Sequence, residues 1–72
     1  MDMTDVAKIV EIVGSSEKGW SEAIQAALDE ANRTIKGITG LEVTDKTAKV
    51  DPSSGKIIEY RAGVKIAFGV KH

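Results

Sequence analysis

The chain of 72 residues contains no cysteine, and its one histidine is the last residue, His72. The absence of cysteine excludes disulfides and thiolate–zinc sites, and a single histidine at the end of the chain makes a histidine-based metal site improbable. A chain of this size buries only about 60% of the surface that its unfolded form exposes, which leaves it marginally stable by itself. Because disulfides and structural metals are the usual staples of such small domains, oligomerisation is the stabilising device that remains.

The chain also lacks an excess of charge of one sign, since it has eleven acidic and ten basic residues and a net charge of −1. This balance provides no broad attraction for nucleic acid or anionic lipid, so we expect neither partner. The apolar runs are short, and the first residues include Asp2 and Asp5 in place of a basic segment before an apolar one. We therefore expect no signal peptide, no membrane span and a cytoplasmic location.

Catalytic patterns are absent as well. No cysteine can act as a nucleophile, no serine stands in a Gly-x-Ser-x-Gly context, and His72 is at the end of the chain. The sequence therefore predicts a protein that is not an enzyme.

What the chain does have is a long alternation of apolar and other residues from Ile58 to Val70. Thirteen residues in this pattern predict a strand with one wet face, far longer than the usual strand of about 5–6 residues, that would reach roughly 43 Å. The apolar members are Ile58, Tyr60, Ala62, Val64, Ile66, Phe68 and Val70. Only one helix-like segment is present to cover this face, so we expect the overhang to be buried against other copies of the chain.

That helix is predicted between Gly19 and Lys36, where the apolar residues recur at spacings of three and four. Its apolar positions are Trp20, Ala23, Ile24, Ala27, Leu28, Ala31 and Ile35. We expect Ser16 or Gly19 at the N-cap, with Glu22 as half of a capping box, and Gly37 as the C′ glycine. Trp20, Ile24, Ala27, Leu28 and Ala31 should pack on Tyr60, Val64, Ile66 and Phe68.

Two further strands are predicted. Val6–Val13 is β-branched and mostly apolar, and the Gly-Ser-Ser at 14–16 should end it. A second strand covers Leu41–Val50, and the turn residues Asp51–Gly55 connect it to the long strand as an antiparallel hairpin. We expect Gly40, Gly63 and Gly69 to relieve strand curvature or to allow close backbone approach. The order is strand, helix, strand, strand, and we expect residues 1–72 to form one domain.

With this order, three segments resemble the dodecins: KIVEIVGSSEKGWSEAIQAALDEA from Lys8, LEV at 41–43 and SGKIIEYRAGVKIAF at 54–68. The resemblance covers essentially the whole chain. It implies an α+β fold in which a three-stranded antiparallel sheet wraps around one helix (β-α-β-β). It also implies a hollow, spherical dodecamer of identical chains.

In the flavin-binding dodecins, a tryptophan before the second strand stacks on the flavin ring and a glutamine in the third strand hydrogen-bonds its polar edge. The positions that match are Gly40 and Arg61. Glycine has no aromatic face and arginine has no acceptor atom, so the resemblance implies a chain without these two contacts to FMN or riboflavin.

A second group of dodecins also lacks the tryptophan, and this chain is more similar to it because of the turn at 50–56 and the Tyr60–Arg61 pair. Members of that group are described as calcium-binding. The candidate ligands here are Asp45, Asp51 and Glu59, repeated around a symmetry axis, although each of them is also typical of a solvated face.

Arg61 and Lys65 are candidates for contact with an anionic ligand, and ion pairs with Glu59 or Glu42 are the alternative. Glu11 and Glu59 could meet on neighbouring strands. Trp20 is interpreted as a packing residue. The sequence thus predicts a noncatalytic, self-assembling, hollow homo-oligomer that binds, stores or buffers a small ligand between subunits. A ligand-free assembly scaffold and a calcium-binding dodecin are the alternatives.

Overall fold

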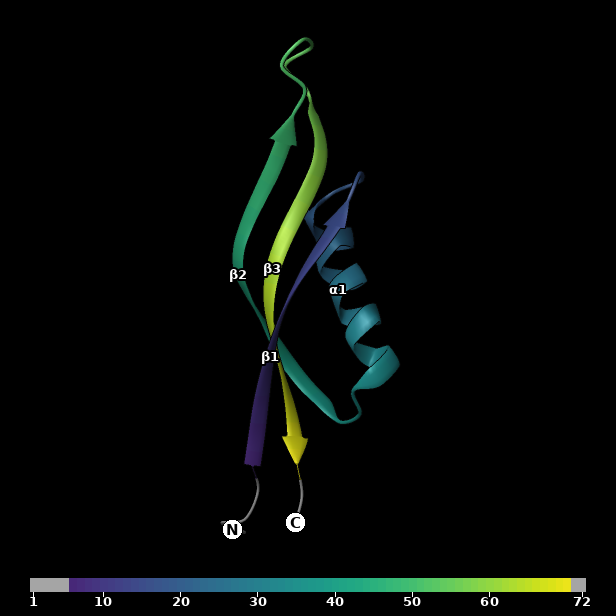
Figure 1. The fold of residues 1–72 in the computed structure, drawn as a ribbon, viewed down its shortest axis with the longest axis vertical. Helices are drawn as coiled ribbons and strands as arrows, with labels where there is room; N and C mark the ends of the chain where they lie inside the picture. Colours follow the sequence, from purple (N-terminus) through teal and green to yellow (C-terminus); the bar gives the residue numbers. More distant parts are fainter. Residues whose placement is uncertain (1–5, 71–72) are drawn as a thin grey trace.

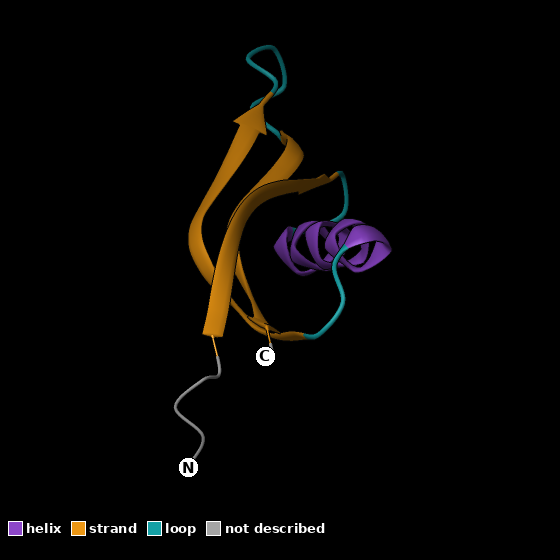
Figure 2. Cartoon of the chain, turned by 60° about the horizontal axis from the view of Figure 1, so that its bottom comes forward, coloured by secondary structure: helices purple, strands orange, loops and turns teal. Residues whose placement is uncertain are grey.

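The computed structural model describes residues 6–70 as four elements. They are, in chain order, β1 (Val6–Ser16), α1 (Trp20–Thr34), β2 (Ile38–Val50) and β3 (Ile57–Val70). The strands form one sheet in the order β1-β3-β2, and β3 pairs antiparallel with both neighbours. Helix α1 lies on one face of the curved sheet, and the opposite face carries no other element of the part described (Figures 1 and 2). The expected α+β fold with the order β-α-β-β is confirmed.

Helix and sheet approach each other closely because the residues between them are small. Ala23, Ala27 and Ala31 are at most 2% exposed and form the buried stripe of α1. A Cβ atom on Gly14 of β1 would lie 2.0 Å from the carbonyl oxygen of Ala23. Gly14 therefore allows the close contact and does not end the strand, so the prediction that β1 stops at Val13 was wrong.

The ends of α1 agree with the prediction only in part. Gly19 is the N-cap, which confirms one of the two predicted alternatives, and its backbone is extended. No side chain caps the helix, so the capping box expected with Glu22 is not formed. The helix ends at Thr34 with Ile35 as its C-cap. Gly37 has a positive φ of 78°, but it lies beyond the C′ position and its carbonyl accepts a hydrogen bond from the N–H of Gly69. It starts the path into β2, which begins at Ile38 rather than at Leu41.

The core is small. Its central cluster consists of Ala27, Ala31, Val64 and Ile66, and only the last two are large side chains that are fully buried. The partly buried residues packed around it are Val10, Ile12, Ile24, Ile35, Ile38 and Val43. The predicted packing of the helix on Val64 and Ile66 is confirmed, whereas Phe68 and Leu28 are only half-buried.

The hairpin of β2 and β3 extends beyond the rest of the molecule (Figure 1). Strand β1 ends where Ser16 pairs with Tyr60, so residues 49–59, which we call the hairpin arm, have no third strand beside them. The chain measures 56 × 20 × 13 Å, with a radius of gyration of 15.3 Å. A compact domain of this length would have a radius of about 11 Å. As expected from the length of the alternation, the helix covers only part of β3.

Candidate functional site

The face of the sheet that points away from α1, the outer face, holds most of the residues singled out in the sequence. Its members on β3 are Glu59, Arg61, Gly63, Lys65 and Ala67, because alternate residues of a strand share a face. The pairing places a partner on each side of the middle three: Glu11 and Glu42 beside Lys65, Val13 and Asp45 beside Gly63, and Ser15 and Thr47 beside Arg61.

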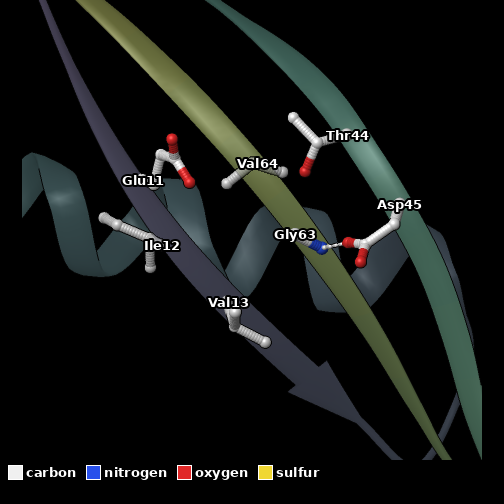
Figure 3. A pocket seen from close by; sticks show the side chains of 7 residues that line it. All are labelled: Glu11, Ile12, Val13, Thr44, Asp45, Gly63 and Val64. Carbon is white, nitrogen blue, oxygen red and sulfur yellow. Dashed lines mark hydrogen bonds between the residues drawn. The ribbon is translucent and has the colours of Figure 1, made fainter.

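A pocket of about 360 Å³ lies over Gly63, where β3 has no side chain. Figure 3 shows the side chains that surround it, from all three strands. They belong to Glu11, Ile12, Val13, Thr44, Asp45 and Val64. The carboxylates of Glu11 on β1 and Asp45 on β2 lie on either side of Gly63.

Asp45 fixes the geometry of this pocket. The register of β2 and β3 shifts between Val43 and Asp45, which leaves Thr44 as the extra residue of a bulge. Oδ1 of Asp45 then accepts a hydrogen bond from the N–H of Gly63 at 3.1 Å. A Cβ on Gly63 would lie 2.3 Å from that oxygen, which confirms the expected close approach at Gly63.

The other two outer-face glycines behave differently. A Cβ on Gly40 or on Gly69 would meet nothing within 4 Å, so neither position requires glycine for close approach. Gly40 pairs with Ala67, whose partner on the other side of β3 is Ile9.

Arg61 lies at a second, shallower pocket of about 320 Å³ lined by Thr47, Ala48, Lys49 and Arg61. Its Nε donates to Oε1 of Glu59 at 2.9 Å, which bears out the predicted ion pair with Glu59 rather than with Glu42. The guanidinium has further N–H donors, and Lys49 adds a second cation beside it. Sequence reasoning missed Lys49 and Thr47, which could have been found only from the register of β2 on β3.

Lys65, the other proposed anion contact, is half-buried between Glu11 and Glu42 on the two neighbouring strands. Two carboxylates around one lysine leave no surplus of positive charge at this point of the outer face. Glu59 pairs with Lys49, and Glu11 pairs with Lys65, six positions further along β3. The expectation that Glu11 and Glu59 could meet was therefore wrong.

The two positions equated with flavin contacts do not come together in one chain. Gly40 is opposite Ala67 and Arg61 is opposite Thr47, so they lie about 20 Å apart along β3. A single small ligand can reach both only if they belong to different copies. As the residues stand, Gly40 provides no ring for stacking and Arg61 provides no acceptor, so they do not fit a flavin.

The three calcium candidates are also separate. Asp45 bonds Gly63, Glu59 bonds Arg61, and Asp51 accepts hydrogen bonds from the N–H and the hydroxyl of Ser53 at 2.9 and 2.8 Å. Those donors hold the pKa of Asp51 below its ordinary value of 3.8. Within residues 6–70, no three acidic or histidine side chains gather where they could hold a metal ion. Since calcium takes six to eight oxygen ligands, residues 6–70 of one chain do not by themselves fit it.

Trp20 packs at the start of α1, as interpreted from its position. Its ring contacts that of Tyr60 edge to face, with centroids 4.9 Å apart at 77°. Its indole N–H donates to the carbonyl oxygen of Thr47 at 3.0 Å. Trp20 therefore links the helix to β3 through Tyr60, the residue before Arg61, and to β2 through Thr47, the residue that pairs with Arg61.

Comparison with known proteins agrees with this fold. The family model described as Dodecin matches residues 6–71. The chain belongs to the dodecin family. A dodecin from Thermus thermophilus is 36% identical over 66 residues, which are 92% of this chain and 93% of that protein. The calcium dodecin from Mycobacterium tuberculosis is 30% identical over 66 residues, with 92% and 90% of the two chains covered.

Solved dodecin structures share the architecture. A crystal structure of a mutant Thermus thermophilus dodecin matches with a TM-score of 0.86 at 32% identity, covering 94% of this chain and 98% of that one. The calcium dodecin structure from Mycobacterium tuberculosis, whose title reports a novel calcium-binding site, matches with a TM-score of 0.76 at 32% identity, covering 88% and 87%. The relatives of this dodecin chain thus include a calcium-binding one. In the described part of the chain, α1 falls short of the length and apolar character of a membrane-spanning helix.

Proposed function

We propose that this chain assembles with copies of itself into a hollow, noncatalytic homo-oligomer, a dodecamer, that holds a small ligand between subunits in the cytoplasm. The whole chain, residues 1–72, acts in it as one dodecin-like domain. The family, the exposed outer face and the small core support the assembly. The two pockets on the outer face support a ligand at the subunit boundary.

The observation that carries this proposal is the surface that the single chain leaves exposed. The accessible surface is 5371 Å² for a mass of 7.7 kDa. A folded monomer of that mass exposes about 4,300 Å². The excess of about 1,000 Å² exceeds the roughly 800 Å² that each partner buries in a standard protein interface. Six large apolar side chains contribute to it: Ile9, Val13, Leu41, Val50, Ile57 and Ile58.

Native mass spectrometry tests the assembly and its ligand together. We expect a complex of twelve chains, with a mass that reports any small molecule retained from the cell. A well-folded monomer of 7.7 kDa at micromolar concentration would refute the proposal. A dodecamer whose mass is that of the protein alone, before and after incubation with ligands, would favour the ligand-free scaffold.

We expect a ligand other than riboflavin or FMN. Gly40 and Arg61 stand where the flavin-binding dodecins have the tryptophan and the glutamine that contact the flavin. We expect no quenching of riboflavin or FMN fluorescence by the native chain at micromolar concentration. The double variant Gly40→Trp/Arg61→Gln restores a ring and an acceptor, and position 40 has room for a side chain. We expect quenching by that variant. Gly69→Trp/Arg61→Gln is the matched control, since position 69 is open as well. Strong quenching by the native chain would contradict this exclusion.

The calcium dodecin among the relatives favours calcium as the second candidate ligand. Here the carboxylates would have to come from several copies, since the described residues of one chain do not gather them. An ion that prefers the native assembly raises its melting temperature at saturating concentration. A rise with calcium that Asp45→Asn, Asp51→Asn or Glu59→Gln abolishes would support this candidate. No rise at millimolar calcium would exclude it.

A further inference from the structure

The shallower pocket of the outer face has two cationic residues in its wall. It is lined by Thr47, Ala48, Lys49 and Arg61 and has a volume of about 320 Å³. Small-molecule sites in proteins begin at about 300 Å³, so the pocket has room for a small chemical group. Arg61 pairs with Thr47, and Lys49 lies two positions further along β2 on the same face.

Arg61 is oriented by a carboxylate and retains most of its donors. Its Nε donates to Oε1 of Glu59 at 2.9 Å, and within residues 6–70 this is the one hydrogen bond that its guanidinium makes. A guanidinium has five N–H groups, so four remain on the two terminal nitrogens. These form a planar fork that matches two oxygens of a carboxylate or a phosphate. The bond to Glu59 thus directs the guanidinium and leaves the fork for a ligand.

Lys49 adds a second positive charge beside this fork. Glu59 is opposite Lys49 in the sheet, but its carboxylate bonds Arg61, and Lys49 forms no salt bridge with another residue of the described chain. Two cations and one carboxylate leave a surplus of one positive charge. The next carboxylate of the outer face on β2 is that of Asp45, whose Oδ1 accepts the N–H of Gly63. The surplus is therefore available to an anion.

Hydroxyl groups and a fixed strand complete the surroundings of Arg61. Its partners in the sheet are Thr47 on β2 and Ser15 on β1, and the hydroxyl of each can donate a hydrogen bond to an anion. The backbone of Thr47 is held from the other face, because its carbonyl oxygen accepts the indole N–H of Trp20 at 3.0 Å. The donors around the pocket thus belong to one chain and lie on a supported part of the sheet.

We propose that this pocket binds the phosphate group of a small ligand through the fork of Arg61 and the ammonium group of Lys49. The fork takes two oxygens, and the ammonium group takes a third. A phosphate group is favoured over a carboxylate because it has three oxygens to offer and a charge of about −1.5 to −2 at neutral pH. This inference rests on the proposed function and deepens it, because it names the chemistry that holds the ligand.

Isothermal titration calorimetry of the native assembly tests this site. The probes are inorganic phosphate and glycerol phosphate, with ionic strength held constant by chloride. We expect both probes to bind saturably at millimolar concentration or below, and glycerol without the phosphate not to bind.

Three lysine and arginine variants locate the site. Arg61→Gln removes the fork and a charge and should raise the dissociation constant for phosphate by about tenfold or more. Lys49→Gln should raise it by about threefold or more. Lys46→Gln is the matched control, because it removes the same charge from β2 and Lys46 pairs with the buried Ala62, on the face opposite to Arg61. It should bind phosphate as the native chain does. Circular dichroism and sedimentation verify that each variant folds and assembles, and Lys49→Gln, at an exposed position, keeps the test valid if Arg61→Gln does not fold.

The failures are distinguishable. No saturable binding of either probe at millimolar concentration, or equal affinities of the native chain and both pocket variants, would overturn the phosphate site. Equal weakening by Lys46→Gln would assign the attraction to overall charge and would overturn it as well. In these cases an assembly that retains a ligand of different chemistry would leave the proposed function standing. A native chain that sediments as a monomer would refute the proposed function, whereas phosphate binding could still be measured because its contacts come from one chain.

Discussion

Two stretches of β3 share one sequence pattern and have opposite surroundings. In the middle of the strand, Ala62, Val64 and Ile66 are at most 1% exposed, beneath α1 and between two neighbouring strands. In the arm, Ile58 is 45% exposed, although it belongs to the same apolar alternation. The alternation therefore specifies which face of a strand is apolar and says nothing about what covers it. In this chain the cover changes from the helix to, as we propose, another copy.

The largest expected effect is at the contact between helix and sheet. Gly14→Ala places a Cβ against the backbone carbonyl of Ala23, which cannot move without the helix, so we expect a loss of about 3 kcal/mol or more in the free energy of unfolding. Gly40→Ala, in open space on the outer face, should leave stability unchanged or slightly raise it. Urea denaturation at one fixed protein concentration compares the two. Equal stability of both variants would show that helix and sheet are not in such close contact.

The next effect separates the two stretches of β3 directly. Ile66→Ala removes one of the two large side chains that are fully buried and should cost about 2–5 kcal/mol at any protein concentration. Ile57→Ala should lower the melting temperature only at concentrations where the native chain is assembled, because the side chain is buried by another copy. Thermal melting over a hundredfold range of concentration measures both. If Ile57→Ala lowers the melting temperature by the same amount at every protein concentration, the contacts of Ile57 lie within one chain.

A smaller effect is expected where Asp45 holds the pocket over Gly63. Asp45→Ala removes a charge-assisted hydrogen bond to the Gly63 N–H and should cost about 1–3 kcal/mol. Gly63→Ala creates the clash with the same carboxylate, so the double variant should be less unstable than the two separate losses add up to. A double-mutant cycle from urea denaturation measures this coupling. Strict additivity would mean that Asp45 and Gly63 do not interact.

Much of the fold was predictable because it is local in the sequence. The spacing of Ala23, Ala27 and Ala31 indicated the buried side of α1, and the turn at Asp51–Gly55 indicated the hairpin. The errors occurred where tertiary contacts decide. Gly14 looks like the end of a strand, yet it is a position where the helix approaches the backbone of β1.

The candidate site was less predictable, because it depends on register. Arg61 could be paired with Glu59 from their spacing, whereas Thr47 and Lys49 reach the same pocket only through the pairing of β2 with β3. The bulge at Thr44 has no sequence signal in a single chain, and it is what turns Asp45 toward Gly63. The hydrophobic pattern and the turn favour a register, but a bulge shifts it locally, and the alternation does not show where that bulge occurs.

The smallest effect concerns the tip of the arm, where Asp51 is tied to its own turn. Because the N–H and hydroxyl of Ser53 stabilise its ionised form, the pKa of Asp51 lies below the ordinary value. Its contribution to stability is present above the unfolded pKa and is lost as the pH falls through the lowered one. Ser53→Ala removes the hydroxyl and should bring the pKa of Asp51 part of the way back, with a smaller rise for Ser54→Ala. Titration of the carboxyl carbon by NMR measures both. An unchanged pKa in Ser53→Ala would assign the stabilisation to the Ser53 N–H and to Ser54, and the arm would then hold its turn without help from the Ser53 hydroxyl.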